Sequence, residues 1–227
     1  MVRSKVIAID GPAAAGKSTI AQKVAEMLGY VYIDTGAMYR ATALFAIEKG
    51  IDIKAQPQLL IECLDQDQLH IEFRQGAEGQ MIYLNGKDVS KRIREADVSI
   101  GSSNVAVLPE VRIFLVKLQR ELAAKQNVIM DGRDIGTYVL PDAELKIFLT
   151  ASVEERARRR CRQLEESGRR CDFEQVVQDI TYRDQNDSQR SFAPLRQAED
   201  AVLVDTTELD FEEAVNKIKD LIRSIQK

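Results

Sequence analysis

Apolar residues occur in two kinds of segment along this chain, short β-branched runs and longer stretches with helical spacing. The short runs have the character of buried strands and cover residues 5–10, 31–34, 127–131, 144–149 and 201–205. Between or after them, helical spacing is found over residues 17–28, 36–49, 152–165, 173–189 and 211–225. Strands that alternate with helices predict an α/β fold, a five-stranded parallel sheet flanked by helices.

A different pattern is found over residues 63–93. Residues 68–74 alternate, a turn is expected over 75–79, and residues 81–84 form a strand before Asn85-Gly86, a strong hairpin signal. We therefore predict a small antiparallel β insertion at 63–93 within one principal domain that covers residues 1–227.

Local signals also mark where helices begin, end and break. Gly29 is expected to end the first helix, and Asp210 with Glu213 predicts a capping box at the start of the last one. Residues 94–125 are expected to be helical with a break at Leu108-Pro109, because proline is tolerated only in the first turn of a helix.

Composition narrows the class of protein. With 227 residues, 44% of them apolar, the chain can bury a substantial core. It has neither a membrane-length apolar run nor an N-terminal stretch typical of a signal peptide, so we expect a soluble, cytoplasmic protein without a membrane partner. A net charge of −4 argues against nucleic acid as a partner, and no oversized apolar face demands an oligomer, so a monomer is expected.

Few side chains are available for thiol or imidazole chemistry. Cys63, Cys161 and Cys171 form no C-x-x-C pair, and all three are expected to be reduced thiols without a metal. His70 is the only histidine and lies in an alternating stretch. Any acid–base chemistry is therefore expected to depend on carboxylates.

The most informative motif follows the first strand and has the form G-x-x-x-x-G-K-[ST] before a helix. Its glycines let backbone N–H groups surround phosphates, Lys17 neutralises β- and γ-phosphate charge, and the Ser18 hydroxyl can reach Mg²⁺. We predict that ATP binds to the residues of this loop: Gly11, Pro12, Ala13, Ala14, Ala15, Gly16, Lys17, Ser18 and Thr19.

Polar residues follow two further strands. Thr35 and Arg40 come after residues 31–34 and are expected at the same edge of the sheet as Lys17, although Thr35 can also be a helix N-cap and Arg40 a surface ion pair. Asp131 ends a buried strand, as a Mg²⁺-associated acid commonly does, and Arg133 and Asp134 are candidates for phosphate and base recognition. An ion pair at the strand end is the alternative.

Arginine is concentrated near the C-terminal third. Ten of the 19 arginines and none of the 13 lysines lie between Arg156 and Arg196, which favours bidentate anion recognition over general solubility. Arg156 and Arg160 share one helix face, and Arg183, Asp187 and Arg190 share another. These two helices are expected to bring their arginines over one cleft, with residues 156–172 as a lid, although a solvated helix face accounts for part of the charge.

With these motifs assembled, the chain resembles the bacterial cytidylate kinases of the nucleoside monophosphate kinase family, which have a P-loop fold. The resemblance rests on the glycine loop, on residues 34–40, 131–136 and 183–190, and on the β insertion. It implies that CMP or dCMP is bound by these residues: Thr35, Tyr39, Arg40, Ser103, Arg112, Arg133, Asp134, Arg183, Asp187 and Arg190.

The resemblance also implies particular roles and a reaction. Thr35 would bond the cytosine end, Asp187 a ribose hydroxyl, and Arg156 and Arg160 the donor phosphates, with Ser18 and Asp131 at Mg²⁺. The expected reaction is transfer of the γ-phosphoryl group of ATP to CMP or dCMP, with Lys17 and the arginines 133, 156, 160 and 183 as its catalytic cations. The alternatives are a kinase of another nucleoside monophosphate or small metabolite, and a nucleotide-binding regulatory ATPase.

Overall fold

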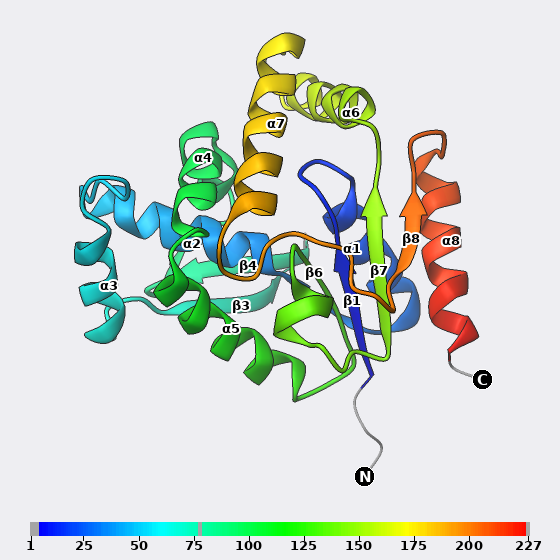
Figure 1. Ribbon diagram of the computed structural model, residues 1–227, viewed down its shortest axis with the longest axis horizontal. Helices are drawn as coiled ribbons and strands as arrows, with labels where there is room; N and C mark the ends of the chain where they lie inside the picture. Colours follow the sequence, from blue (N-terminus) through cyan, green and yellow to red (C-terminus); the bar gives the residue numbers. More distant parts are fainter. Residues whose placement is uncertain (1–4, 77–78, 226–227) are drawn as a thin grey trace. The chain divides into compact units, whose positions relative to one another are not determined.

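The computed structural model describes residues 5–76 and 79–225, and the chain divides into two compact units (Figure 1). Unit 1 contains the described residues up to Ile33 and from Arg120 onward, and unit 2 runs from Asp34 to Gln119. Each unit has its own hydrophobic core.

A five-stranded parallel sheet forms the centre of unit 1, with strand order β2-β6-β1-β7-β8 (Figure 1). Each strand lies within one or two residues of its predicted range. Burial explains the continuous apolar run of β6, since every residue of that strand is buried. The strands are β1 Val6–Asp10, β2 Val31–Asp34, β6 Val128–Gly132, β7 Leu145–Thr150 and β8 Val202–Asp205.

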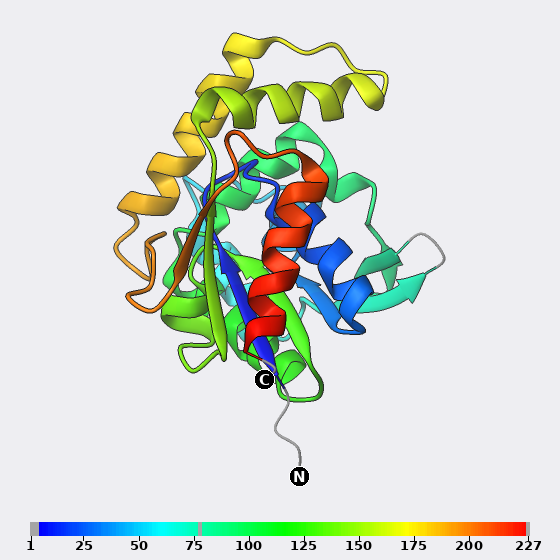
Figure 2. The ribbon, with the colours of Figure 1, turned by 90° about the vertical axis from the view of Figure 1, so that its right-hand side faces the viewer.

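Helices α1 (Lys17–Leu28) and α8 (Phe211–Ser224) pack against each other beside this sheet (Figure 2). Their apolar faces join the strands in one buried core, as expected for amphipathic helices. Both predicted end signals are confirmed: Gly29 is left-handed (φ 69°) after α1, and Asp210 with Glu213 forms the capping box of α8.

Helices α6 (Val153–Glu166) and α7 (Phe173–Gln189) form a helical hairpin after β7 (Figure 1). They are held together by a small apolar cluster around Ala157, Val176 and Ile180. The predicted helices are therefore confirmed. Between β6 and β7 the chain also makes a π-helical turn, η2 (Ile135–Val139), that the hydrophobic pattern did not predict.

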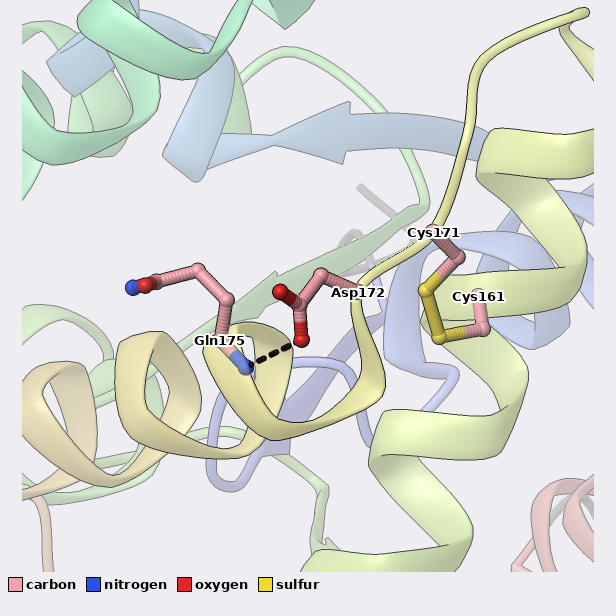
Figure 3. Close-up of a disulfide and its surroundings, with 4 residues drawn as sticks. All are labelled: Cys161, Cys171, Asp172 and Gln175. Carbon is pink, nitrogen blue, oxygen red and sulfur yellow. Dashed lines mark hydrogen bonds between the residues drawn. A yellow bond between two sulfur atoms is a disulfide. The ribbon is translucent and has the colours of Figure 1, made fainter.

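The expectation of three reduced thiols is wrong. Cys161 on α6 and Cys171, just before α7, form a disulfide with a Cα–Cα distance of 5.2 Å, while Cys63 is free (Figure 3). The chain reverses between the two helices and brings together cysteines ten residues apart. That proximity is a tertiary property, so the sequence spacing did not reveal it.

Unit 2 combines helices with the predicted β insertion. Strands β3 to β5 form an antiparallel three-stranded sheet, and Asn85 and Gly86 have the positive φ angles (48° and 80°) that a tight hairpin requires. Residues 77–78 of the expected first turn lie outside the described part. The elements are α2 Thr35–Glu48, α3 Pro57–Asp65, β3 Ile71–Gly76, β4 Gly79–Leu84, β5 Lys87–Asp88, η1 Arg92–Arg94, α4 Ala96–Val105 and most of α5 Pro109–Ala123.

Helix α3 was not predicted, and it includes the first three residues of the segment that was expected to be β structure. It has nine residues and buries only Leu60 and Leu64, so its helical pattern in the sequence is too short to recognise. Pro57 lies in its first turn, where a missing N–H group costs nothing.

Across the described residues, no single helix has both the length and the apolar character needed to cross a membrane. The bent pair α4 and α5 meets that criterion jointly, by length and composition alone.

Candidate active site

The glycine loop connects β1 to α1 and has the backbone geometry of an anion-binding turn. A Cβ atom at Gly11 would lie 1.9 Å from the carbonyl oxygen of Leu149, so only glycine fits there. Ala14 and Gly16 both have positive φ angles, 58° and 88°. Because Gly16 is the N-cap of α1, the first N–H groups of the helix face the loop without a capping side chain.

Lys17 is buried inside this loop, where its Nζ donates a hydrogen bond to the carbonyl oxygen of Pro12 at 2.7 Å. Burial lowers the pKa of Lys17 from 10.5 to about 7, and the positive charge of Arg133 acts in the same direction, against the opposing carboxylates of Asp131, Asp187 and Asp10. A phosphate in the loop would restore the charged form, because it supplies the compensating anion that burial otherwise lacks.

Ser18 lies at the start of α1 and donates a hydrogen bond to Asp131 Oδ2 at 2.8 Å. The hydroxyl of Tyr32 on β2 donates to Asp131 Oδ1 at 2.9 Å. Three neighbouring elements thus bring oxygen atoms together at the carboxyl end of the sheet. The predicted pair of Ser18 and Asp131 is in contact, and Tyr32 is an addition that its place in an apolar strand did not signal.

Four predicted binding residues form one buried charge cluster. Arg133 Nε donates to Asp187 Oδ2 at 2.6 Å, and Arg190 donates to Asp134 Oδ1 at 3.1 Å. Arg190 also lies 3.9 Å from Asp187. The cluster joins the loop after β6 to the end of α7, and Asp134, Asp187 and Arg190 are all buried. The alternating charges give a site that can bind both a phosphate and sugar hydroxyls.

Within this cluster the charged forms are favoured despite burial. Burial opposes ionisation of Asp187, but the charge and hydrogen bond of Arg133 more than compensate, so its pKa lies below the ordinary value. Burial likewise opposes the charge of Arg133, and Asp187 holds the pKa of the guanidinium above its usual range.

The buried carboxylate of Asp10, which the sequence analysis did not single out, holds the loop after β6 in place. It accepts hydrogen bonds from the backbone N–H groups of Ile135 and Gly136, both at 2.8 Å. Burial raises the pKa of Asp10 to about 7, even though these two donors favour the carboxylate. The feature of the sequence that could have identified Asp10 is its position directly before the glycine loop.

Within unit 2, Asp34 contacts both the start of α2 and the Arg40 side chain, in the motif at residues 34–40. Its carboxylate caps α2 by accepting from the Ala37 N–H at 2.8 Å, and it pairs with Arg40 at 2.8 Å. Thr35 is buried as the first residue of α2 and is not its N-cap residue. A Cβ atom at Gly36 would lie 3.0 Å from the Arg40 guanidinium, so this glycine allows a close approach.

Two other residues that the family resemblance implied also lie in unit 2. Arg112 is fully buried, 5.5 Å from the ring centroid of Tyr39, and donates to the Ala106 carbonyl oxygen. Ser103 is buried on α4.

The expected lid residues lie on the helical hairpin of unit 1. Arg156 is buried and donates to the carbonyl oxygen of Ala13 in the glycine loop at 2.9 Å. Arg159, which was not predicted, reaches the Ala15 carbonyl oxygen at 3.4 Å, whereas Arg160 donates to Gln163 along its own helix. Arg183 is half-buried on α7.

A parallel sheet whose central strand leads into such a loop, with a hydroxyl and a carboxylate meeting at the neighbouring strand end, defines the class of P-loop phosphotransferases. The comparisons with known proteins identify the family within that class. A family model described as cytidylate kinase matches residues 7–224. The chain therefore belongs to the cytidylate kinase family, as the resemblance implied.

Individual relatives agree with this assignment. A protein named cytidylate kinase from Caldicellulosiruptor bescii is 49% identical over 221 residues, which is 97% of this chain and 96% of that protein. Another, from Anoxybacillus flavithermus, is 51% identical over 217 residues, or 96% of this chain and 95% of the relative. A solved structure of an uncharacterized protein from Eubacterium ventriosum has a TM-score of 0.54 at 13% identity and covers 97% of this chain and 99% of that one. That likeness concerns the fold alone.

Proposed function

We propose that this protein transfers the γ-phosphoryl group of ATP to the 5′-phosphate of CMP or dCMP, giving ADP and CDP or dCDP. The observation that carries the proposal is the glycine loop, with Lys17 buried in it and Ser18 bound to Asp131 at 2.8 Å. Such a loop neutralises the donor phosphates. The names of the relatives supply the cytidylate acceptor.

We assign the acceptor to the residues that the family resemblance implied. In unit 1, Arg133, Asp134, Asp187 and Arg190 form the buried charge cluster, and Arg183 lies on α7 together with Asp187. In unit 2 the acceptor residues are Thr35, Tyr39, Arg40, Ser103 and Arg112.

The chemistry requires positioning and positive charge more than proton transfer. An acceptor phosphate oxygen is already ionised near neutral pH, so the reaction needs no general base. Charge spreads over the transferred group in the transition state, where arginine forks are effective partners. We assign this stabilisation to Lys17, Arg133 and Arg183, with Arg160 and the buried Arg156 as further candidates from the lid.

Magnesium fits the oxygen atoms at the end of the sheet. The Asp131 carboxylate and the Ser18 hydroxyl are hard oxygen donors, and Mg²⁺ commonly takes one or two carboxylates together with waters and substrate phosphates. The described residues contain no group of three or more His, Cys, Asp or Glu side chains suited to a metal. When bound, Mg²⁺ would neutralise donor phosphate charge. Asp131→Asn should raise the Mg²⁺ concentration needed for half-maximal activity.

A coupled assay of acceptor-dependent ADP release tests the proposed acceptor. The assay compares CMP and dCMP with UMP, AMP and GMP at fixed Mg·ATP. We expect the largest kcat/KM with CMP or dCMP. Equal rates with all five acceptors would contradict the cytidylate assignment, and slow ATP hydrolysis without acceptor dependence would instead favour a regulatory ATPase.

A further inference from the structure

The backbone of Ala13, in the middle of the glycine loop, is bound on both sides by the helical hairpin. Its N–H group donates to Asp184 Oδ1 on α7 at 3.0 Å, and its carbonyl oxygen accepts from Arg156 on α6 at 2.9 Å. The two side chains are themselves paired, with Arg156 donating to Asp184 Oδ2 at 2.6 Å. Asp184 therefore connects the loop, α6 and α7 through one carboxylate.

The hairpin also binds the loop at a second carbonyl group. Arg159 contacts the Ala15 carbonyl oxygen, while Lys17 occupies that of Pro12. When arginines of the hairpin bind the carbonyl groups of Ala13 and Ala15, the N–H groups of the loop can converge on a phosphate.

The residue next to this contact has a costly backbone conformation. Ala14 has a φ angle of 58°, which residues other than glycine rarely adopt. Such a conformation costs of the order of 1 kcal/mol and persists when neighbouring contacts hold it in place. The hydrogen bonds to Ala13, directly before Ala14, can do so, together with the longer contact of Arg159 to Ala15.

We propose that Asp184 is a positioning residue for the donor site. Its carboxylate fixes the backbone of Ala13, and thereby Ala14, in the conformation that binds the donor phosphates. Arg156 takes part as the partner that orients the carboxylate. The proposal concerns donor binding alone and does not depend on which nucleotide is the acceptor.

The alternative is that Asp184 stabilises only the hairpin. The two roles are separated by Ala14→Gly, because glycine adopts a positive φ angle without a steric penalty. If Asp184 acts by holding the loop conformation, then glycine at position 14 should restore donor binding after the carboxylate is lost. A purely structural role predicts no such rescue.

The test measures ATP binding to the full chain by titration calorimetry, together with the KM values for ATP and CMP. For Asp184→Ala we expect Kd and KM for ATP to rise roughly tenfold or more, the usual effect of losing hydrogen bonds to a charged group, with KM for CMP changed by less than about twofold. Asp184→Ala/Ala14→Gly should recover most of the ATP affinity without recovering Tm. Asp179→Ala is the matched control, because that carboxylate is exposed on the same helix and accepts from Gln175.

Two results would overturn the proposal: unchanged ATP affinity in Asp184→Ala, or equal ATP affinity in the single and double variants. If Asp184→Ala does not fold, Asp184→Asn replaces it in both comparisons, with the same expected direction and the same overturning results. Because ATP binding is measured without an acceptor, a wrong acceptor assignment would leave this result intact.

Discussion

Arg133 and Asp187 are joined by a 2.6 Å hydrogen bond between charged groups, which connects the loop after β6 to the end of α7. The Arg133 side chain is 20% exposed and that of Asp187 is 9% exposed. In such surroundings, removing one partner leaves a charge that is poorly solvated and unpaired. The pair is therefore expected to stabilise this part of unit 1 as well as to bind substrate.

We expect Arg133→Ala and Asp187→Ala each to lower the free energy of unfolding by about 3 kcal/mol. The double variant should lose less than the sum of the two, with a coupling energy of about 1 kcal/mol or more, because both single changes disrupt the same pair. Urea unfolding of the wild type, the two single variants and the double variant provides the double-mutant cycle. If the losses in the free energy of unfolding simply add, the two side chains are not coupled and the expectation is wrong.

Arg183→Ala is expected to lower kcat by about 10³-fold and to change KM for ATP only slightly, since the arginine is assigned to charge that develops in the transition state. Steady-state kinetics with Mg·ATP and CMP measure both constants. Arg158→Ala is the control, because that side chain is 61% exposed and pairs with Glu155 on its own helix. An unchanged kcat in Arg183→Ala would contradict the assigned role.

Asp10 is expected to make stability depend on pH between about 4 and 7. Burial raises its pKa from 3.8 to about 7 on folding, so the folded state binds the proton more tightly. The resulting stability is fully present below pH 3.8 and is lost as the pH rises through 7, by at most about 4 kcal/mol. Asp10→Asn should remove this slope.

Urea unfolding across that pH range, compared between wild type and Asp10→Asn, measures the effect. The variant should be less stable overall, because an amide oxygen replaces only one of the two acceptors for the N–H groups of Ile135 and Gly136. The difference in slope is the decisive quantity, and parallel pH profiles would contradict the raised pKa.

The disulfide between Cys161 and Cys171 should stabilise the helical hairpin. Closing a loop of this length reduces the entropy of the unfolded chain and contributes about 2 to 3 kcal/mol. Dithiothreitol should therefore lower the Tm of the wild type and leave that of Cys161→Ser/Cys171→Ser unchanged. Cys63→Ser, at the free cysteine, should behave as the wild type does. A wild-type Tm insensitive to the reductant would argue against a stabilising disulfide.

The strand, cap and motif signals were local, and the structure agrees with them for local reasons. The capping box of Asp210 and Glu213 lies within one helical turn, and the glycine loop is recognisable from the strand before it and the helix after it. Ser18 and Asp131 were both expected at Mg²⁺, and they are in contact because parallel strands bring their carboxyl ends to the same edge.

The less successful predictions concerned contacts between distant segments. The thiols of Cys161 and Cys171 pair only because α6 and α7 fold back on each other. Asp184 and Tyr32 gave no signal of their own, since one lies in a largely polar helix and the other in an apolar strand. Arg156 was recognised as a candidate, but its burial against Ala13 was not.

The sequence by itself determined the alternating fold, the position of the nucleotide loop and the family, because these depend on periodicity and on motifs with fixed spacing. Only the tertiary structure decided which charges pair, which carboxylate holds the loop backbone and which cysteines meet. Those relationships depend on distances between residues far apart in the chain, such as Ala13 and Asp184, which packing sets and local spacing does not encode.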